Sequence, residues 1–275
     1  MSIKGDISGM SGPYENKGGA FTSMETSGSS CPCSLDEYAK GRYPVFRETH
    51  IGDRKGERRM SVVYVLRCSD GIIAAADRRE TIRKNDQIAY NDTVKKIFVI
   101  PNTRIVVTAS GQITFGQSHE SIESIVQSCT SKETEPLIKE ICEKIQSCGP
   151  VETSAYIWAT EAPACVMSSA NFMRLEIKPT YNNNIRLGET IVVDKLRIDH
   201  GLAFFNGENW AVNILKEVLL PSLPTGETIE KVKDIFRLIL AVKPMVPYDK
   251  QTISDTIDMV AIQGENVEWH TFGKT

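Results

Sequence analysis

Residues 60–79 read MSVVYVLRCSDGIIAAADRR, and the local structure of this stretch decides how the rest of the chain is interpreted. Apolar runs on both sides, Ser61–Arg67 and Ile72–Ala76, flank an Asp-Gly dipeptide. Short β-branched runs around Asp-Gly predict a β-hairpin, because this dipeptide suits a tight turn. A hairpin returns the chain to near its origin. We therefore expect Asp77, just past the second strand, at the same end as Ser61.

The composition is that of an ordinary globular protein. Of the 275 residues, 41% are hydrophobic and 24% are charged, which is enough apolar material for a substantial core. The formal net charge of -3 provides no basic surface, so nucleic acid is not expected as a partner. The first residues, MSIKGDISGMSGPYENKGG, lack the apolar segment of a secretory signal, and no apolar run is long enough to cross a bilayer. We expect a cytoplasmic protein with no membrane partner.

The cysteines and histidines indicate no metal site. Seven scattered cysteines, an odd number, are typical of reduced thiols. Cys31-Pro-Cys33 is the only close pair, and no second pair completes a zinc site. The four histidines have no ligand spacing. The sequence therefore predicts neither a metal nor a cofactor.

Hydrophobic patterning divides the chain near residue 60. Residues 1–60 are rich in Gly, Ser, Lys and Glu and show no sustained periodicity, which predicts a disordered leader before a folded domain at 61–275. In that domain the patterns predict strands at 61–67, 72–76, 94–100, 104–110, 155–160, 164–169, 173–178, 256–262 and 267–272, helices at 118–129, 136–145, 208–219 and 227–242, and a polar turn at 83–91. Two helix pairs separated by blocks of strands predict a layered α+β domain in which helices cover a sheet sandwich.

Several runs, in order, carry a family resemblance. SVVYVLRCSDGIIAAADRRE (61–80), TVKKIF (93–98) and TASGQ (108–112) place a hydroxyl residue at the start of one strand, an aspartate at the end of the next and a lysine at the start of the third. NGENWAVNIL (206–215) and SDTIDMVAI (254–262) match the family's third helix and penultimate strand. The chain from residue 61 onward resembles the catalytic β-type subunits of the proteasome and its bacterial relative, the peptidase subunit of the ATP-dependent ring protease. This resemblance implies a four-layer αββα sandwich of two antiparallel sheets flanked by helix pairs.

The resemblance also implies roles for individual residues. Ser61 sits where the family has its N-terminal nucleophile, usually a threonine, and Asp77 and Lys96 match the catalytic aspartate and lysine. Gly111 matches the glycine whose backbone N–H forms the oxyanion hole. The supporting positions are Arg79, which holds a turn, Asn206, where the family has a serine, and Asp249 and Ser254, whose register the spacing leaves open.

These residue types suit amide hydrolysis. A serine hydroxyl needs an adjacent base, and a free α-amine with a pKa near ~8 can accept and return a proton. A neighbouring lysine disfavours further positive charge, and a carboxylate fixes that lysine. A backbone N–H aimed at the oxyanion contributes on the order of 3 kcal/mol. Taken singly, Ser61 as a strand start, Asp77 in a solvated turn and Lys96 as an edge-strand charge are ordinary features, so the prediction depends on their joint order.

The α-amine can act as the base only if Ser61 is the first residue. Residues 1–60 are either a propeptide that is cleaved off or a stretch upstream of the true start at Met60. Two features favour Met60: the family usually has glycine before a self-processed nucleophile, and KGERR (55–59) can be encoded by a purine-rich sequence that resembles a ribosome-binding site. We expect the mature protein to begin at Ser61.

The resemblance predicts a ring-shaped endopeptidase that is fed by an ATPase and acts on peptides or unfolded proteins. Two alternatives stay open, namely a stand-alone amidase or transpeptidase of the same fold and a catalytically inactive structural subunit. Apolar faces of the helices at 120–129 and 136–145 are expected to contribute to subunit contacts. By position, the candidate specificity pocket comprises Glu80, Val94, Phe98, Ala109 and Ile113, which indicates cleavage after apolar residues, or after basic ones if Glu80 dominates.

Overall fold

The structure, a computed structural model, describes residues 61–84, 87–164, 170–182, 185–198, 203–217, 223–247 and 251–273. All of them belong to one compact unit, Val45–Thr275. The leader at 1–60, Asp249 and most of the strand expected at 164–169 lie outside the described residues.

Two five-stranded sheets form the centre of the fold. The first has the order β12 (Ala203–Gly207), β1 (Val62–Arg67), β2 (Gly71–Asp77), β13 (Thr256–Gln263) and β14 (Asn266–Gly273). The second has the order β11 (Ile185–Ile198), β10 (Ala170–Asn182), β9 (Ala155–Glu161), β6 (Ile105–Gly111) and β5 (Ile97–Val99). Neighbouring strands in both sheets are antiparallel, as the sequence predicts.

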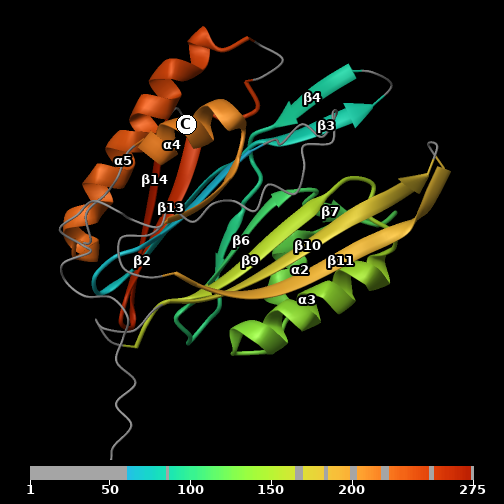
Figure 1. Ribbon diagram of the computed structural model, residues 1–275, viewed down its shortest axis with the longest axis horizontal. Helices are drawn as coiled ribbons and strands as arrows, with labels where there is room; N and C mark the ends of the chain where they lie inside the picture. The colour runs from blue at the N-terminus through green and yellow to red at the C-terminus, as the bar shows by residue number, and fades with distance from the viewer. Residues whose placement is uncertain are drawn as a thin grey trace, which may run out of the picture. The chain divides into compact units, whose positions relative to one another are not determined.

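Helices cover the outer faces of the two sheets. The helices α2 (Ile122–Gln127) and α3 (Thr134–Cys148) pack on the second sheet, and α4 (Asn209–Glu217) and α5 (Thr225–Val242) pack on the first (Figure 1). A third apolar cluster fills the space between the sheets. The short helix η1 (Lys243–Met245) follows α5. The domain is therefore an αββα sandwich with four layers, and the predicted fold class is confirmed.

The first strand shows why the sequence of residues 62–67 is continuously apolar. Val62, Tyr64 and Leu66 face α4 and α5, whereas Val63 and Val65 face the second sheet. Because both faces of β1 are buried, the strand lacks the alternation of a half-exposed strand. Burying each such side chain stabilises the fold by about 1.5–3 kcal/mol.

Several local expectations are wrong. The polar turn expected at 83–91 is part of a hairpin of β3 (Glu80–Lys84) and β4 (Gln87–Asn91). A second short strand pair, β7 (Thr114–Phe115) and β8 (Glu120–Ser121), precedes α2. The strands β11 and β12 are absent from the sequence-based prediction. β11 has few fully buried side chains, so its pattern lacks the apolar run that marks an inner strand.

The helix faces expected at subunit contacts lie in the chain's own core. Ile122, Ile125 and Val126 of α2 are at most 3% exposed, and the apolar residues of α3 pack beside them on the second sheet. The amphipathic pattern is therefore explained by packing within one subunit, and the contribution of these helices to subunit contacts stays a prediction.

The cysteines inside the described ranges, Cys68, Cys129, Cys142 and Cys148, are free thiols, as expected for those four. Within the same ranges, no helix combines the length and the apolar character that a membrane span requires.

Candidate active site

The hairpin of β1 and β2 and the start of β5 bring Ser61, Asp77 and Lys96 together. The register of β1 on β2 places Val62 beside Asp77, and the Val62 N–H donates to Asp77 Oδ1 at 2.8 Å. Lys96 immediately precedes β5 in the other sheet. Its Nζ donates to Ser61 Oγ at 2.6 Å and to Asp77 Oδ1 at 3.1 Å. The predicted trio therefore forms one cluster in the structure.

This cluster is almost completely removed from water. Ser61, Asp77 and Lys96 are 2%, 1% and 1% exposed. Burial lowers the pKa of Lys96 below the ordinary lysine value, because it disfavours the ammonium form, although Asp77 acts in the opposite direction. A lysine whose pKa is lowered in this way is easier to use as a neutral base.

Four donors surround the Asp77 carboxylate. Oδ1 accepts from Val62 N–H and Lys96 Nζ, and Oδ2 accepts from the backbone N–H groups of Arg79 at 2.8 Å and Ser254 at 3.1 Å. Three of the four are backbone donors from three different segments of the chain. Asp77 therefore fixes these segments as well as the lysine.

Arg79 acts on the cluster through its main chain and holds the turn through its side chain. Its carbonyl oxygen accepts from Lys96 Nζ and lies 3.5 Å from Ser61 Oγ. The guanidinium makes a bidentate pair with Asp92 at 2.7 and 2.6 Å and donates to the Gln251 carbonyl at 2.6 Å. These contacts tie the segment after β2 to the segments before β5 and β13.

Two glycines border the cluster. Gly111 ends β6 at a φ of +77°, and Ala109, two residues earlier, donates its N–H to the Lys96 carbonyl at 2.9 Å, so Gly111 lies at the Lys96 end of the sheet. Gly207 was not singled out from the sequence. A Cβ on Gly207 would meet the Ser61 carbonyl oxygen at 2.1 Å, so only glycine permits this approach of β12 to Ser61.

Of the remaining supporting residues expected from the sequence, the structure places Ser254 in contact with the cluster. The contact is the hydrogen bond to Asp77 described above. The backbone of Asn206 pairs with Val63, but its side chain lies outside the described residues, as does all of Asp249. The expected roles of Asn206 and Asp249 thus stay predictions.

An ion pair that no sequence pattern predicts lies beside the cluster. Arg78 makes a bidentate pair with Asp258 at 2.7 and 2.6 Å, and its N–H donates to Ser254 Oγ at 3.0 Å. Thr271 Oγ1 also donates to Asp258 at 2.8 Å. This pair anchors the end of β2 to β13, the strand that follows Ser254.

The residues expected to form a specificity pocket do not share an open surface. Ala109 and Ile113 are each 1% exposed in the core beneath α2 and α3, where Val94 also packs. Glu80 accepts a hydrogen bond from Thr114 Oγ1 at 3.1 Å. Phe98 lines a different pocket, described below. Two of the five expected members are thus core residues, and the specificity pocket stays a prediction.

Comparisons with known proteins find similarity among solved structures. No model of a protein family matches the chain, and no curated protein matches it. Among solved structures, the chain is similar to an Anbu (Gly-1) mutant from Hyphomicrobium sp. strain MC1, with 14% sequence identity and a TM-score of 0.48. The similarity covers 78% of this chain and 88% of that chain.

Proposed function

We propose that this chain is a proteasome-like endopeptidase that hydrolyses peptide bonds with Ser61 as an N-terminal nucleophile. The observation that supports this most is the double contact of Lys96 Nζ, at 2.6 Å to Ser61 Oγ and at 3.1 Å to Asp77 Oδ1, inside a buried cluster. Burying a lysine costs free energy, and the fold does not require a lysine beside a serine at a strand start. A catalytic role accounts for the combination.

In the proposed reaction, Ser61 Oγ attacks the carbonyl carbon of a peptide bond and its proton passes to a base. The C–N bond then breaks, and the base returns the proton to the leaving amine, which leaves an acyl ester on Ser61. Water, deprotonated by the same base, attacks the ester carbonyl, the bond between the acyl carbon and Ser61 Oγ breaks, and the base returns the proton to Oγ as the acid is released. The Gly111 N–H is the proposed donor to the oxyanion.

We propose the free α-amine of Ser61 as the base, with Lys96 tuning its proton affinity. The backbone of Ser61 supports a cleavage before this residue. Its φ of 121° lies in a region that L-residues rarely adopt, so the uncleaved chain carries local strain. Loss of the bond between residues 60 and 61 removes this torsion and creates the amine. Lys96 alone is the replacement base if the amine is not required.

Assembly into a ring fed by an ATPase, in the cytoplasm, is part of the same proposal and is supported by the family resemblance. Light scattering tests it on active protein. A monomer, no heavier than the 30.6 kDa of the full chain, with intact peptidase activity would favour the stand-alone amidase.

The decisive experiment compares three proteins on peptides: one that begins at Ser61, one with a fixed extension before Ser61, and Ser61→Ala. Intact mass establishes the first residue of each. We expect a peptide β-lactone to acylate Ser61 in the first protein only, and we expect turnover to be lost in the other two. Ser61→Thr serves as the control, since it keeps the hydroxyl. Full activity in the extended protein would rule out the amine as the base, and full activity in Ser61→Ala would rule out the proposed function.

A further inference from the structure

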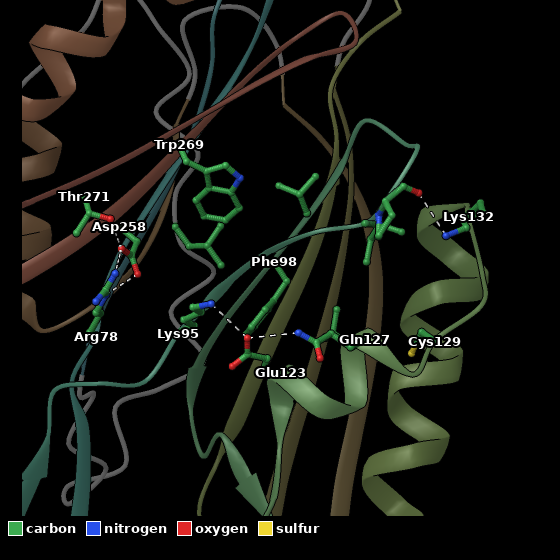
Figure 2. A pocket seen from close by; sticks show the side chains of 15 residues that line it. Arg78, Lys95, Phe98, Glu123, Gln127, Cys129, Lys132, Asp258, Trp269 and Thr271 are labelled. Carbon is green, nitrogen blue, oxygen red and sulfur yellow. Dashed lines mark hydrogen bonds and ion pairs between the residues drawn. The ribbon is translucent and has the colours of Figure 1, made fainter.

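A second site lies at one edge of the sandwich, where β5 and β14 end their sheets. A pocket of about 490 Å³ opens there, within the size range of ligand sites. Figure 2 shows Phe98 and Trp269 near its middle, with the Arg78–Asp258 pair at one side and Lys132 at the other. The helix α2 contributes Glu123 and Val126 to the lining.

The pocket exists because the two sheets are offset. β5 contacts β2 and β13 of the facing sheet, so β14 lies one strand further out. Phe272 of β14 packs toward α5, whereas Trp269 and Thr271 face the pocket. Trp269 is 51% exposed, although it lies on the face that the second sheet covers elsewhere. The geometry leaves room for one more strand beside β5 and opposite β14.

The backbone of β5 presents its unpaired side to this space. The consecutive residues from Ile97 to Ile100 all line the pocket. Because successive side chains of a strand point to opposite faces of the sheet, a pocket on one face would contact only every second residue. The pocket therefore lies along the edge of β5. The Ile100 N–H and the Lys96 carbonyl bond to β6. In an antiparallel pair the intervening residues point the other way, so the N–H and C=O groups of Ile97 and Val99 point away from β6. Within the described residues, no strand pairs with this edge.

The charges around the pocket are unequal at its two ends. At one end Arg78 is paired with Asp258, and Lys95 lies 3.5 Å from Glu123. At the other end Lys132 Nζ donates to the Pro101 carbonyl at 3.3 Å. Among the described residues, no carboxylate lies within ion-pair distance of Lys132. A carboxylate on a bound molecule would complement this cation.

We propose that the edge of β5 binds an extended peptide segment of a partner protein as a sixth strand of the second sheet. The segment pairs with the N–H and C=O groups of Ile97 and Val99, lays apolar side chains over Trp269, and places an acidic residue against Lys132. In the antiparallel direction the acidic residue comes first. The site is separate from the catalytic cluster, because Lys96 contacts Ser61 while its neighbours Lys95 and Ile97 line the pocket. The proposal does not rest on the proposed function.

The test uses the peptide acetyl-Asp-Val-Thr-Val-Thr-Val-Lys-amide, which carries fluorescein on the side-chain amine of its lysine, and fluorescence anisotropy. The host protein is the full chain with Ser61→Ala, so that peptide cleavage does not affect the measurement. Two control peptides carry N-methyl groups, one on the valines and one on the threonines. A peptide paired to β5 directs only one of these two sets of N–H groups at the strand. We expect one control to bind at least about tenfold more weakly and the other to bind like the parent peptide.

Two protein variants test the same contact from the other side. Val99→Pro removes an N–H that points away from β6, a position where an edge strand tolerates proline, and we expect it to weaken binding by about tenfold. Lys132→Glu should weaken the binding of the acidic peptide and strengthen the binding of a peptide with Lys in place of Asp. Lys139→Glu, an equal charge change on an exposed lysine of α3, should leave binding unchanged.

Equal affinity for both methylated peptides, or unchanged affinity in Val99→Pro, would overturn the proposal. The proposal would also be overturned if the protein does not bind the peptide but self-associates, and if Val99→Pro abolishes this self-association. The occupant of the edge would then be a second copy of the chain.

Discussion

Asp77→Asn is the substitution whose cost can be worked out most directly from the structure. The Asp77 carboxylate accepts from four donors, two on each oxygen. An asparagine keeps one oxygen and replaces the other with an NH₂ group. If the NH₂ replaces Oδ1, it meets Val62 N–H and Lys96 Nζ. If it replaces Oδ2, it meets the N–H groups of Arg79 and Ser254. In the first orientation the Val62 N–H loses its acceptor, whereas Lys96 Nζ keeps Ser61 Oγ and the Arg79 carbonyl oxygen. In the second orientation two backbone N–H groups lose their acceptor.

Each buried donor without a partner costs about 1–3 kcal/mol, so one or two such donors in Asp77→Asn should lower the free energy of unfolding by about 1–6 kcal/mol. For a domain of this size that corresponds to a fall in Tm of roughly 2–24 °C. The matched variant is Lys96→Met, which removes one of the four donors and leaves the carboxylate with three backbone N–H groups. We expect Lys96→Met to be less destabilising than Asp77→Asn and yet inactive.

The assay is urea unfolding followed by circular dichroism, together with turnover of a peptide substrate. A loss below about 0.5 kcal/mol in Asp77→Asn would refute the four-donor arrangement. A larger loss in Lys96→Met than in Asp77→Asn would refute the argument that Asp77 stabilises the fold mainly through backbone donors.

Three further predictions concern single residues. Gly207→Ala should destabilise the fold and abolish turnover, because its Cβ would lie 2.1 Å from the Ser61 carbonyl oxygen, and unchanged turnover would contradict this. Burial raises the pKa of Cys68 to about 11, so this thiol should resist iodoacetamide at pH 8 in native protein and react after unfolding, as mass mapping can check. Burial lowers the pKa of Lys96, so the unfolded chain binds more protons than the folded chain between the lowered value and about 10.5. The free energy of unfolding of the wild type, relative to that of Lys96→Met, should therefore rise with pH in that window. Parallel denaturation curves of the two proteins check this.

The sequence was most informative where the signal was local. The Asp-Gly turn and the apolar runs of residues 61–77 are enough to predict the hairpin, because turn geometry and burial act over a few residues. The order of Ser61, Asp77 and Lys96 at the ends of three predicted strands also indicated that their side chains meet, as they do in the structure. The strand β11 escaped prediction because its exposed side chains weaken the pattern, and its position is set by the long pairing with β10.

Only the tertiary structure decided how the segments meet. Lys96 contacts Ser61 across 35 residues, and the Ser254 N–H reaches Asp77 across 177 residues. A backbone N–H is the same at every residue except proline, so no pattern in the sequence marks Ser254 as a partner of Asp77. The close approach of Gly207 to Ser61 and the offset that leaves one edge of β5 without a partner strand among the described residues depend likewise on how two sheets pack. The sequence alone determined the first hairpin, the four helices and the reactive residue types. The packing of one sheet on the other determined the hydrogen bonds between them, because those bonds join groups that are distant along the chain.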